Sequence, residues 1–121
     1  MARYVDGYVL PVPKKNLAAY RRMAQTASKV WRKYGALQYV ECVGDDLNLK
    51  WAGIKFPRTV RLKAGETVVF AFIVYKSRAQ RDRVNARVMK DPQLNQAFND
   101  QPMPFDMKRM VCGGFRVIVE A

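Results

Sequence analysis

The sequence predicts one α+β domain over residues 1–121, with a four-stranded antiparallel sheet and two main helices in the order β-α-β-β-α-β. Half of the 121 residues are hydrophobic, which is enough for a single buried core in a chain of this length. Residues 68–75 are an uninterrupted apolar run of β-branched and aromatic types, typical of a central strand covered on both faces. Residues 17–34 repeat apolar side chains at intervals of three and four, which predicts a long amphipathic helix.

The first strand is expected at residues 4–10, because prolines follow it at positions 11 and 13. Side chains alternate between the two faces of a strand, so Tyr4, Asp6 and Tyr8 share one face. An acid between two tyrosines is unusual on a strand. We interpret Asp6 either as a buried, hydrogen-bonded carboxylate or as part of a pocket.

The long helix is expected to begin after Asn16, a candidate N-cap, and to end at Gly35, a residue type that commonly follows a helix. Its apolar stripe includes Tyr20 and Trp31. The opposite face is basic and contains no acid; its members are Arg21, Arg22, Lys29, Arg32 and Lys33. A charged face is usually a solvated surface. The lack of compensating acids leaves a second interpretation open, which is binding to a polyanion.

A second strand is expected at residues 37–43, with Tyr39 and Glu41 on the same face. The turn that follows places Asp45 and Asp46 side by side. Neighbouring acids can indicate a cation site, but no further oxygen ligands follow at the spacing of a calcium-binding loop. We therefore expect no metal here.

Residues 45–66 are the least regular part of the chain and mix basic side chains with Trp51 and Phe56. Aromatic rings can stack on bases while cations neutralise phosphates, which makes Lys55 and Arg58 candidates for polyanion binding. The alternative is a long loop anchored by its two aromatic side chains. Loops of this length in a compact domain are commonly functional.

The second helix is expected to follow the central strand, from Ser77 to about residue 90. Ser77 and Gln80 have the spacing of a capping box, and a proline at position 92 ends the helix. Arg81 and Asn85 lie one turn apart near the edge that faces the sheet. Either they fasten the helix to the sheet, because buried polar groups find partners, or they reach a ligand.

The C-terminal part predicts a short helix at residues 93–98 and a last strand at residues 109–119. Gly113 and Gly114 indicate a bulge or a close backbone contact within that strand. The resulting order of elements is the split β-α-β arrangement of ferredoxin-like domains.

The composition restricts the classes of function. The chain has 22 basic and 10 acidic side chains, a net charge of +12, which favours attraction to anions or an acidic partner. The absence of histidine excludes histidine bases and the common catalytic triads. Two cysteines outside any CxxC motif are expected to be buried thiols of a reducing compartment. With no apolar signal core and no run long enough to span a membrane, we expect a cytoplasmic protein.

Several short stretches together resemble the YbaA-like family of small bacterial proteins of unknown function (DUF 1428). They are YVDGY at 4–8, VEC at 40–42, GDD at 44–46, FPR at 56–58, RD at 81–82 with Asn85, Met89 with DP at 91–92, MPFD at 103–106, KRM at 108–110 and GGF at 113–115. The resemblance implies a dimeric α/β barrel: a homodimer in which two four-stranded sheets pack face to face, with the helices outside. It implies no established activity, cofactor or catalytic residue. Val43, Phe72 and Val74 depart from the family pattern toward smaller or more apolar side chains.

Two functional hypotheses follow. Related dimeric barrels bind hydrophobic or aromatic compounds, and some oxidise them without metal or flavin. A small-molecule site of this kind, with monooxygenase-like activity as one form, would use Asp6, Tyr8, Glu41, Asn85 and Arg109 and no cofactor. A carboxylate in an apolar barrel has a raised pKa and can act as a base. The alternatives are that Asp6 and Glu41 are paired with Arg109 or Lys108 across strands, that the basic surface binds nucleic acid or another polyanion, or that the charge only maintains solubility.

Overall fold

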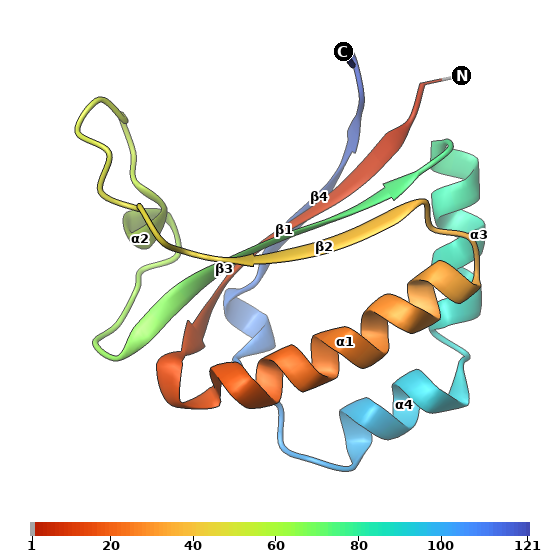
Figure 1. Cartoon of the computed structure of the whole chain (residues 1–121), viewed down its shortest axis with the longest axis horizontal. Helices are drawn as coiled ribbons and strands as arrows, with labels where there is room; N and C mark the ends of the chain where they lie inside the picture. Colours follow the sequence, from red (N-terminus) through yellow and green to blue (C-terminus); the bar gives the residue numbers. More distant parts are fainter. Residues whose placement is uncertain (1) are drawn as a thin grey trace.

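The computed structural model describes residues 2–121 as one sheet with three helices on a single side (Figure 1). Four strands form the sheet: β1 (Tyr4–Pro13), β2 (Gln38–Val43), β3 (Glu66–Tyr75) and β4 (Val111–Arg116). Their spatial order is β2-β3-β1-β4, and every neighbouring pair is antiparallel. This is the predicted ferredoxin-like arrangement, and the predicted α+β fold is confirmed.

Strand β1 continues through both prolines, so the expected end at residue 10 is wrong. Lys14 N–H donates to the Gly65 carbonyl on the β3 side, at 2.8 Å. Because N–H groups alternate between the two edges of a strand, the nitrogens of Pro11 and Pro13 point to the other edge. There β4 pairs with β1 only as far as Val9. The missing donors therefore cost no ladder hydrogen bond.

Helix α1 (Leu17–Lys33) follows a short 3₁₀ turn, η1 (Lys14–Asn16), and its predicted stripe faces the sheet. Gly35 has a φ of 115°, the left-handed backbone that the predicted C-terminal glycine supplies. The prediction that the Asn16 side chain caps the N-terminus of α1 is wrong. Its side chain caps no helical N–H and donates instead to the Pro104 carbonyl, at 3.1 Å. Asn16 therefore fastens the start of α1 to the C-terminal segment.

Helix α3 (Arg78–Val88) begins as the capping motif predicts, because the Ser77 hydroxyl accepts from Gln80 N–H at 3.2 Å. Helix α4 (Pro92–Asn99) is capped by Asp91, whose Oδ1 accepts from the N–H groups of Gln93 and Leu94. The carboxylate of Asp91 is buried, and its Oδ2 also accepts from the Tyr34 hydroxyl at 2.6 Å. This contact joins α4 to the end of α1.

Residues 44–65 form an arm that extends from the β2–β3 end of the sheet (Figure 1). It contains one short helix, α2 (Phe56–Thr59), where the sequence predicts only irregular chain. The ring of Phe56 packs on that of Phe70, with centroids 6.4 Å apart. Trp51 does not anchor the arm as one interpretation predicts, because its side chain is 83% exposed.

Strand β4 is shorter than the predicted 109–119. Residues before it form a 3₁₀ turn, η2 (Met107–Arg109), in which Asp106 accepts from Lys108 N–H at 3.0 Å. At its other end, Arg116 pairs with Tyr4, the first residue of β1. That is the last pair of the ladder, although Val117 N–H still donates to the carbonyl of Arg3, which precedes β1, at 3.0 Å.

The helices cover one face of the sheet and leave the other face, here called the open face, uncovered. The prediction that β3 is covered on both faces is therefore wrong for a single chain. Register places these apolar side chains on the open face: Val5, Val9, Val40, Cys42, Phe70, Phe72, Val74, Val111 and Phe115. Exposure reaches 43% at Phe70 and 62% at Phe115. Exposed apolar side chains gathered on one face make the open face a candidate interaction surface.

Both cysteines are exposed, which contradicts the expectation that they are buried. Cys42 lies on the open face opposite Phe70, and Cys112 lies on the edge strand β4. Neither position is covered by a helix within the described residues. The exposure of Cys42 follows from the one-sided layering, whereas Cys112 pairs with Tyr8 on the helix side and is exposed at the edge of the sheet.

Candidate functional site

A cavity of about 220 Å³, partly open to solvent, lies between α1 and the sheet, with residues of the C-terminal segment in its lining. Aromatic side chains form much of its wall: Tyr8, Tyr20, Trp31, Tyr39, Phe98 and Phe105. Five of the six methionines of the chain line it as well: Met23, Met89, Met103, Met107 and Met110. Alanine, leucine and isoleucine complete the lining, with one exception. That exception is the carboxyl group of Glu41.

Glu41 projects from β2 toward α1 and is held by two phenols. The Tyr20 hydroxyl donates to Oε1 at 2.5 Å, and the Tyr39 hydroxyl donates to Oε2 at 2.7 Å. Tyr20 comes from α1, whereas Tyr39 lies two residues earlier on the same strand face as Glu41. The carboxylate therefore has one donor on each oxygen and bridges helix to sheet.

Each of these phenols also belongs to an aromatic pair. The rings of Tyr20 and Phe105 meet edge to face, with centroids 5.6 Å apart. The rings of Trp31 and Tyr39 are tilted, with centroids 5.9 Å apart. Glu41 is thus bracketed by two aromatic pairs, which restrict the rotation of both donors.

A second hollow, of about 490 Å³, lies on the outer side of the same bridge, between α1 and β2. Its lining includes Arg21, Gln25 and Ser28 together with Tyr20, Tyr39 and Glu41. Glu41 consequently borders an apolar inner cavity and a more polar outer groove. The Tyr20–Glu41–Tyr39 bridge separates the two.

The tyrosines of the cavity are held in their neutral, hydrogen-donating form. Burial raises the pKa of Tyr20, and its hydrogen bond to Glu41 raises it further. Burial and the charge of Glu41 likewise raise the pKa of Tyr39. Burial also raises the pKa of Tyr8, whose ring lines the cavity opposite α1. These phenols can donate a hydrogen bond to a carboxylate at any physiological pH.

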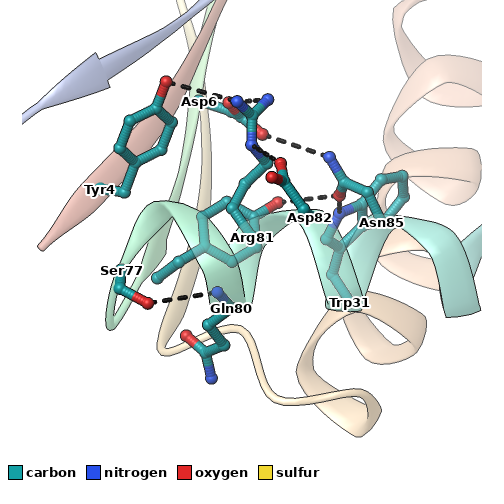
Figure 2. Close-up of polar contacts among 9 residues, drawn as sticks. Tyr4, Asp6, Trp31, Ser77, Gln80, Arg81, Asp82 and Asn85 are labelled. Carbon is teal, nitrogen blue, oxygen red and sulfur yellow. Dashed lines mark hydrogen bonds and ion pairs between the residues drawn. The ribbon is translucent and has the colours of Figure 1, made fainter.

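Asp6 belongs to a separate network of polar contacts (Figure 2). Its side chain meets Arg81 Nη1 at 3.2 Å and Asn85 Nδ2 at 3.5 Å. Asn85 Oδ1 in turn accepts from Trp31 Nε1 at 3.0 Å and from the Tyr75 hydroxyl at 3.1 Å. The side-chain oxygen and nitrogen of Asn85 are both engaged, so the fastening interpretation of this residue fits the geometry.

Burial raises the pKa of Asp6, and the neighbouring Arg81 guanidinium opposes that rise. This direction agrees with the predicted behaviour of a carboxylate in apolar surroundings. Arg81 is itself held over the ring of Tyr4, at 4.8 Å from its centroid, and lies 3.0 Å from Asp82. Asp6 therefore faces a fixed cation and does not line the cavity.

Arg109 is separate from the other four candidates. Its guanidinium grips Glu66 through two contacts, at 2.6 and 2.9 Å, and donates to the Arg61 carbonyl at 2.9 Å. The expected pairing of Arg109 with Asp6 or Glu41 is wrong, because the Arg109 guanidinium is bound to Glu66 at the start of β3. Of the five predicted site residues, Tyr8 and Glu41 line the cavity, whereas Asp6 and Asn85 belong to the separate polar network.

The predicted polyanion-binding residues occupy two different sides of the sheet. Arg21, Arg22 and Lys29 are exposed on α1, whereas Arg58 is exposed on the arm (Figure 1). The other three side chains make contacts within the chain. Arg32 donates to the Ala36 and Leu37 carbonyls, Lys33 pairs with Asp91 at 3.3 Å, and Lys55 contacts Asn48 at 2.6 Å.

Sequence reasoning missed the phenol partners of Glu41 and the methionine wall. Tyr20 and Tyr39 are visible in the sequence only as members of apolar stripes. Three of the methionines lie in the link between α4 and β4, which carries no periodic signal. Among residues 2–121, no group of three or more cysteine, aspartate or glutamate side chains is placed to hold a metal ion. None of the helices described is long and apolar enough to cross a membrane.

Comparison with known proteins identifies related chains of similar length. Residues 3–107 match the model of a family described as "Protein of unknown function (DUF1428)". The uncharacterized protein YbaA of Escherichia coli (strain K12) is 39% identical over 118 residues, which cover 98% of both chains. YbaA of Shigella flexneri matches to the same extent. These matches confirm the predicted family.

Solved structures share the fold at low sequence identity. A dimeric ferredoxin-like protein from an uncultured marine organism has a TM-score of 0.62, at 11% identity and full coverage of both chains. Rv0793 from Mycobacterium tuberculosis has a TM-score of 0.60, at 14% identity and 99% coverage of both. SnoaB from Streptomyces nogalater, a cofactor-independent oxygenase, has a TM-score of 0.55 at 11% identity, covering 99% of this chain and 97% of SnoaB. At these identities the likeness shows the fold alone.

Proposed function

This chain belongs to the DUF1428 family of proteins of unknown function, and we propose from its geometry that it binds a small, largely apolar molecule in the cavity between α1 and the sheet. One observation carries the proposal: an apolar cavity of about 220 Å³ contains a single carboxylate, Glu41, oriented by two phenols. Ligand sites are mostly apolar hollows with few, well-placed polar groups. Glu41 is the polar anchor, and the methionine side chains adapt the wall to the shape of the ligand.

Native mass spectrometry of gently purified, nuclease-treated protein tests this proposal. We expect a retained small-molecule mass on the natural protein. Ala71→Leu enlarges a buried residue of the cavity floor and should abolish the extra mass. Ala79→Leu makes the same change at an exposed position of α3 and should leave it unchanged. Equal retention of the small-molecule mass by both variants would show that the ligand binds elsewhere, and would refute the proposal that this cavity is the binding site.

A cofactor-independent oxygenation is the second candidate, because a carboxylate beside an apolar cavity can accept a proton from an activated carbon. The SnoaB likeness supports this candidate at the level of fold only. In such a reaction Glu41 removes a proton from a CH₂ group flanked by aromatic rings, and the carbanion reduces O₂. The balanced outcome converts CH₂ and O₂ to a carbonyl and water.

Oxygen uptake with anthrone, which contains such a CH₂ group, tests the second candidate. We expect uptake by the natural protein and its loss in Glu41→Gln, which keeps the size of the side chain but removes the base. Glu120→Gln removes a charge from an exposed position and should retain activity. Uptake that is equal in both variants, or absent throughout, would contradict a role for Glu41 as a base.

We further infer that two copies pack through their open faces. Exposed Phe70, Val111 and Phe115 supply the apolar surface, and the dimeric ferredoxin-like relative in structure supports the arrangement. The two exposed thiols fit the reducing compartment expected for a cytoplasmic protein. Phe70→Glu should shift the native mass from dimer to monomer, whereas Gln93→Glu on the exposed side of α4 should not. A dimer that survives Phe70→Glu would refute this interface.

A further inference from the structure

The carboxylate of Glu41 makes no ion pair among residues 2–121, although Arg21 lines the outer groove that Glu41 also borders. The basic side chains of this strongly basic protein are all excluded from the cavity lining, in which Glu41 is the one carboxylate. Among residues 2–121, no lysine or arginine nitrogen lies within 4.0 Å of its oxygens. The other buried or half-buried carboxylates differ in this respect, since Asp6 meets Arg81, Glu66 meets Arg109, and Asp91 meets Lys33.

The phenol donors stabilise Glu41 without neutralising it. Tyr20 and Tyr39 each donate one hydrogen bond, and both stay uncharged because burial raises the pKa of each. A charge in apolar surroundings ordinarily needs a counter-ion. The carboxyl group therefore has neutral donors only, and a cationic ligand would supply the positive group that the lining lacks.

The aromatic and methionine side chains of the cavity lining also favour a positively charged ligand. Aromatic faces are the negative side of the ring quadrupole and attract cations that lie over them. Two aromatic pairs, Tyr20 with Phe105 and Trp31 with Tyr39, flank the carboxylate. The methionine sulfurs of the lining are soft and polarizable. Carboxylate, ring faces and thioethers all favour positive charge on the ligand.

We propose that the ligand of this cavity is an organic cation, an amine or quaternary ammonium group carrying an apolar body, with the cation at Glu41 and the body against the methionines. This proposal rests on the cavity being a ligand site, as proposed above. A neutral phenol or alcohol could use the carboxylate lone pairs that Tyr20 and Tyr39 leave free, but it would bring no positive charge to Glu41. A quaternary ammonium needs no lone pair and gains from charge alone.

The basic exterior does not oppose this assignment strongly. Charges on the solvent side of α1 are screened over about 8 Å at physiological ionic strength. The interaction between Glu41 and a bound cation is screened less, because the two charges would be in direct contact beside an apolar lining. The local field of the cavity, and not the net charge of the chain, selects the ligand.

Phenyltrimethylammonium and tert-butylbenzene test the proposal, because they have the same shape and differ in charge. Methionine-methyl ¹³C labelling gives the readout, since five of the six methionines line the cavity. We expect the cation to bind about tenfold more tightly than its neutral isostere, the scale of a desolvated cation–π contact. Hydrophobic transfer alone predicts the opposite order, which makes the comparison decisive in the natural protein without any variant.

Glu41→Gln and Glu120→Gln locate the source of the preference. The preference for the cation should fall to less than about threefold in Glu41→Gln and stay unchanged in Glu120→Gln. Tighter binding of the neutral isostere by the natural protein would overturn the cation assignment while leaving the cavity as a ligand site. Methionine signals that respond to neither compound at millimolar concentration would count against both proposals.

Discussion

Replacement of Tyr20 by phenylalanine isolates one contact of the Tyr20–Glu41–Tyr39 bridge. The ring stays in place against Phe105, so the change removes the hydroxyl and creates no large cavity. The hydroxyl lies 2.5 Å from Glu41 Oε1, and Tyr20 is 8% exposed. Glu41 then keeps a single phenol donor, from Tyr39.

The expected cost follows from the type of hydrogen bond. Hydrogen bonds to charged groups contribute about 1.5–3 kcal/mol. Water from the outer groove can reach Glu41 and replace part of the lost contact, so we expect Tyr20→Phe to lower the free energy of unfolding by about 1–2 kcal/mol. At about 3–6 °C per kcal/mol for a chain of this size, the melting temperature should fall by several degrees.

Urea unfolding monitored by circular dichroism measures this change, with Tyr8→Phe as a matched control. Tyr8 lines the same cavity, but its hydroxyl makes no side-chain hydrogen bond to residues 2–121, so its removal should cost less than about 0.5 kcal/mol. In a Glu41→Gln background the acceptor is uncharged, and Tyr20→Phe should cost about 1 kcal/mol less than it does beside the carboxylate. The reasoning would be refuted if Tyr20→Phe lowered the free energy of unfolding no more than Tyr8→Phe does, or lowered it equally with Glu41 and with Gln at position 41. Either result would show that the Tyr20 hydrogen bond to the Glu41 carboxylate does not stabilise the fold.

Further predictions concern pH, the arm and the basic helix. The Tyr34 hydroxyl holds the pKa of Asp91 below its usual 3.8. The contribution of Asp91 to stability is therefore present above that pH and is lost as the pH falls through the folded pKa. The urea midpoints of the natural protein and Asp91→Asn should converge below about pH 4, and a constant gap between them would contradict this. The phenols of Tyr20 and Tyr39 have raised pKa values, so the stability of the protein should decline as the pH rises above 10.0. Ultraviolet titration should show these phenols ionising only as the protein unfolds. Ionisation of these phenols near pH 10 in the folded protein would contradict the argument that burial raises their pKa. A lysine at position 109 cannot keep both contacts to Glu66, so Arg109→Lys should accelerate amide hydrogen exchange in residues 55–65 while the helices stay protected. Unchanged exchange in residues 55–65 would show that another contact holds the arm. With three uncompensated cations on α1, affinity for a single-stranded oligonucleotide should be weak and its logarithm should fall with log salt at a slope of about −2; a slope near −6 would revive the polyanion hypothesis.

Much of the fold was predictable because it depends on short-range patterns. Each correctly predicted feature depends on side chains that are close in sequence. Examples are the apolar stripe of α1, the cap at Ser77 and the apolar run of β3. The boundaries that were predicted wrongly depend on distant partners. Strand β1 tolerates its prolines because its pairing with β4 stops at Val9, and at the other end the pairing stops at Tyr4, the first residue of β1.

The candidate site was predictable only in part. Tyr8 and Glu41 stood out as polar groups on apolar strand faces, and both line the cavity. Arg109 was placed wrongly, because a long cationic side chain can reach several acids and sequence does not rank them. Glu66, which it grips, lies 43 positions away in the chain.

The sequence by itself determined the elements, their order, the family and the basic face of the long helix, because each depends on periodicity, capping or motif. Only the tertiary structure decided that an unneutralised carboxylate lies among phenols and methionines. Tyr20 comes from α1, Tyr39 and Glu41 from β2, and most of the methionines from the link before β4. These segments have no local relation to one another. Their meeting is a consequence of helix packing on one side of the sheet, which the chain as a whole controls.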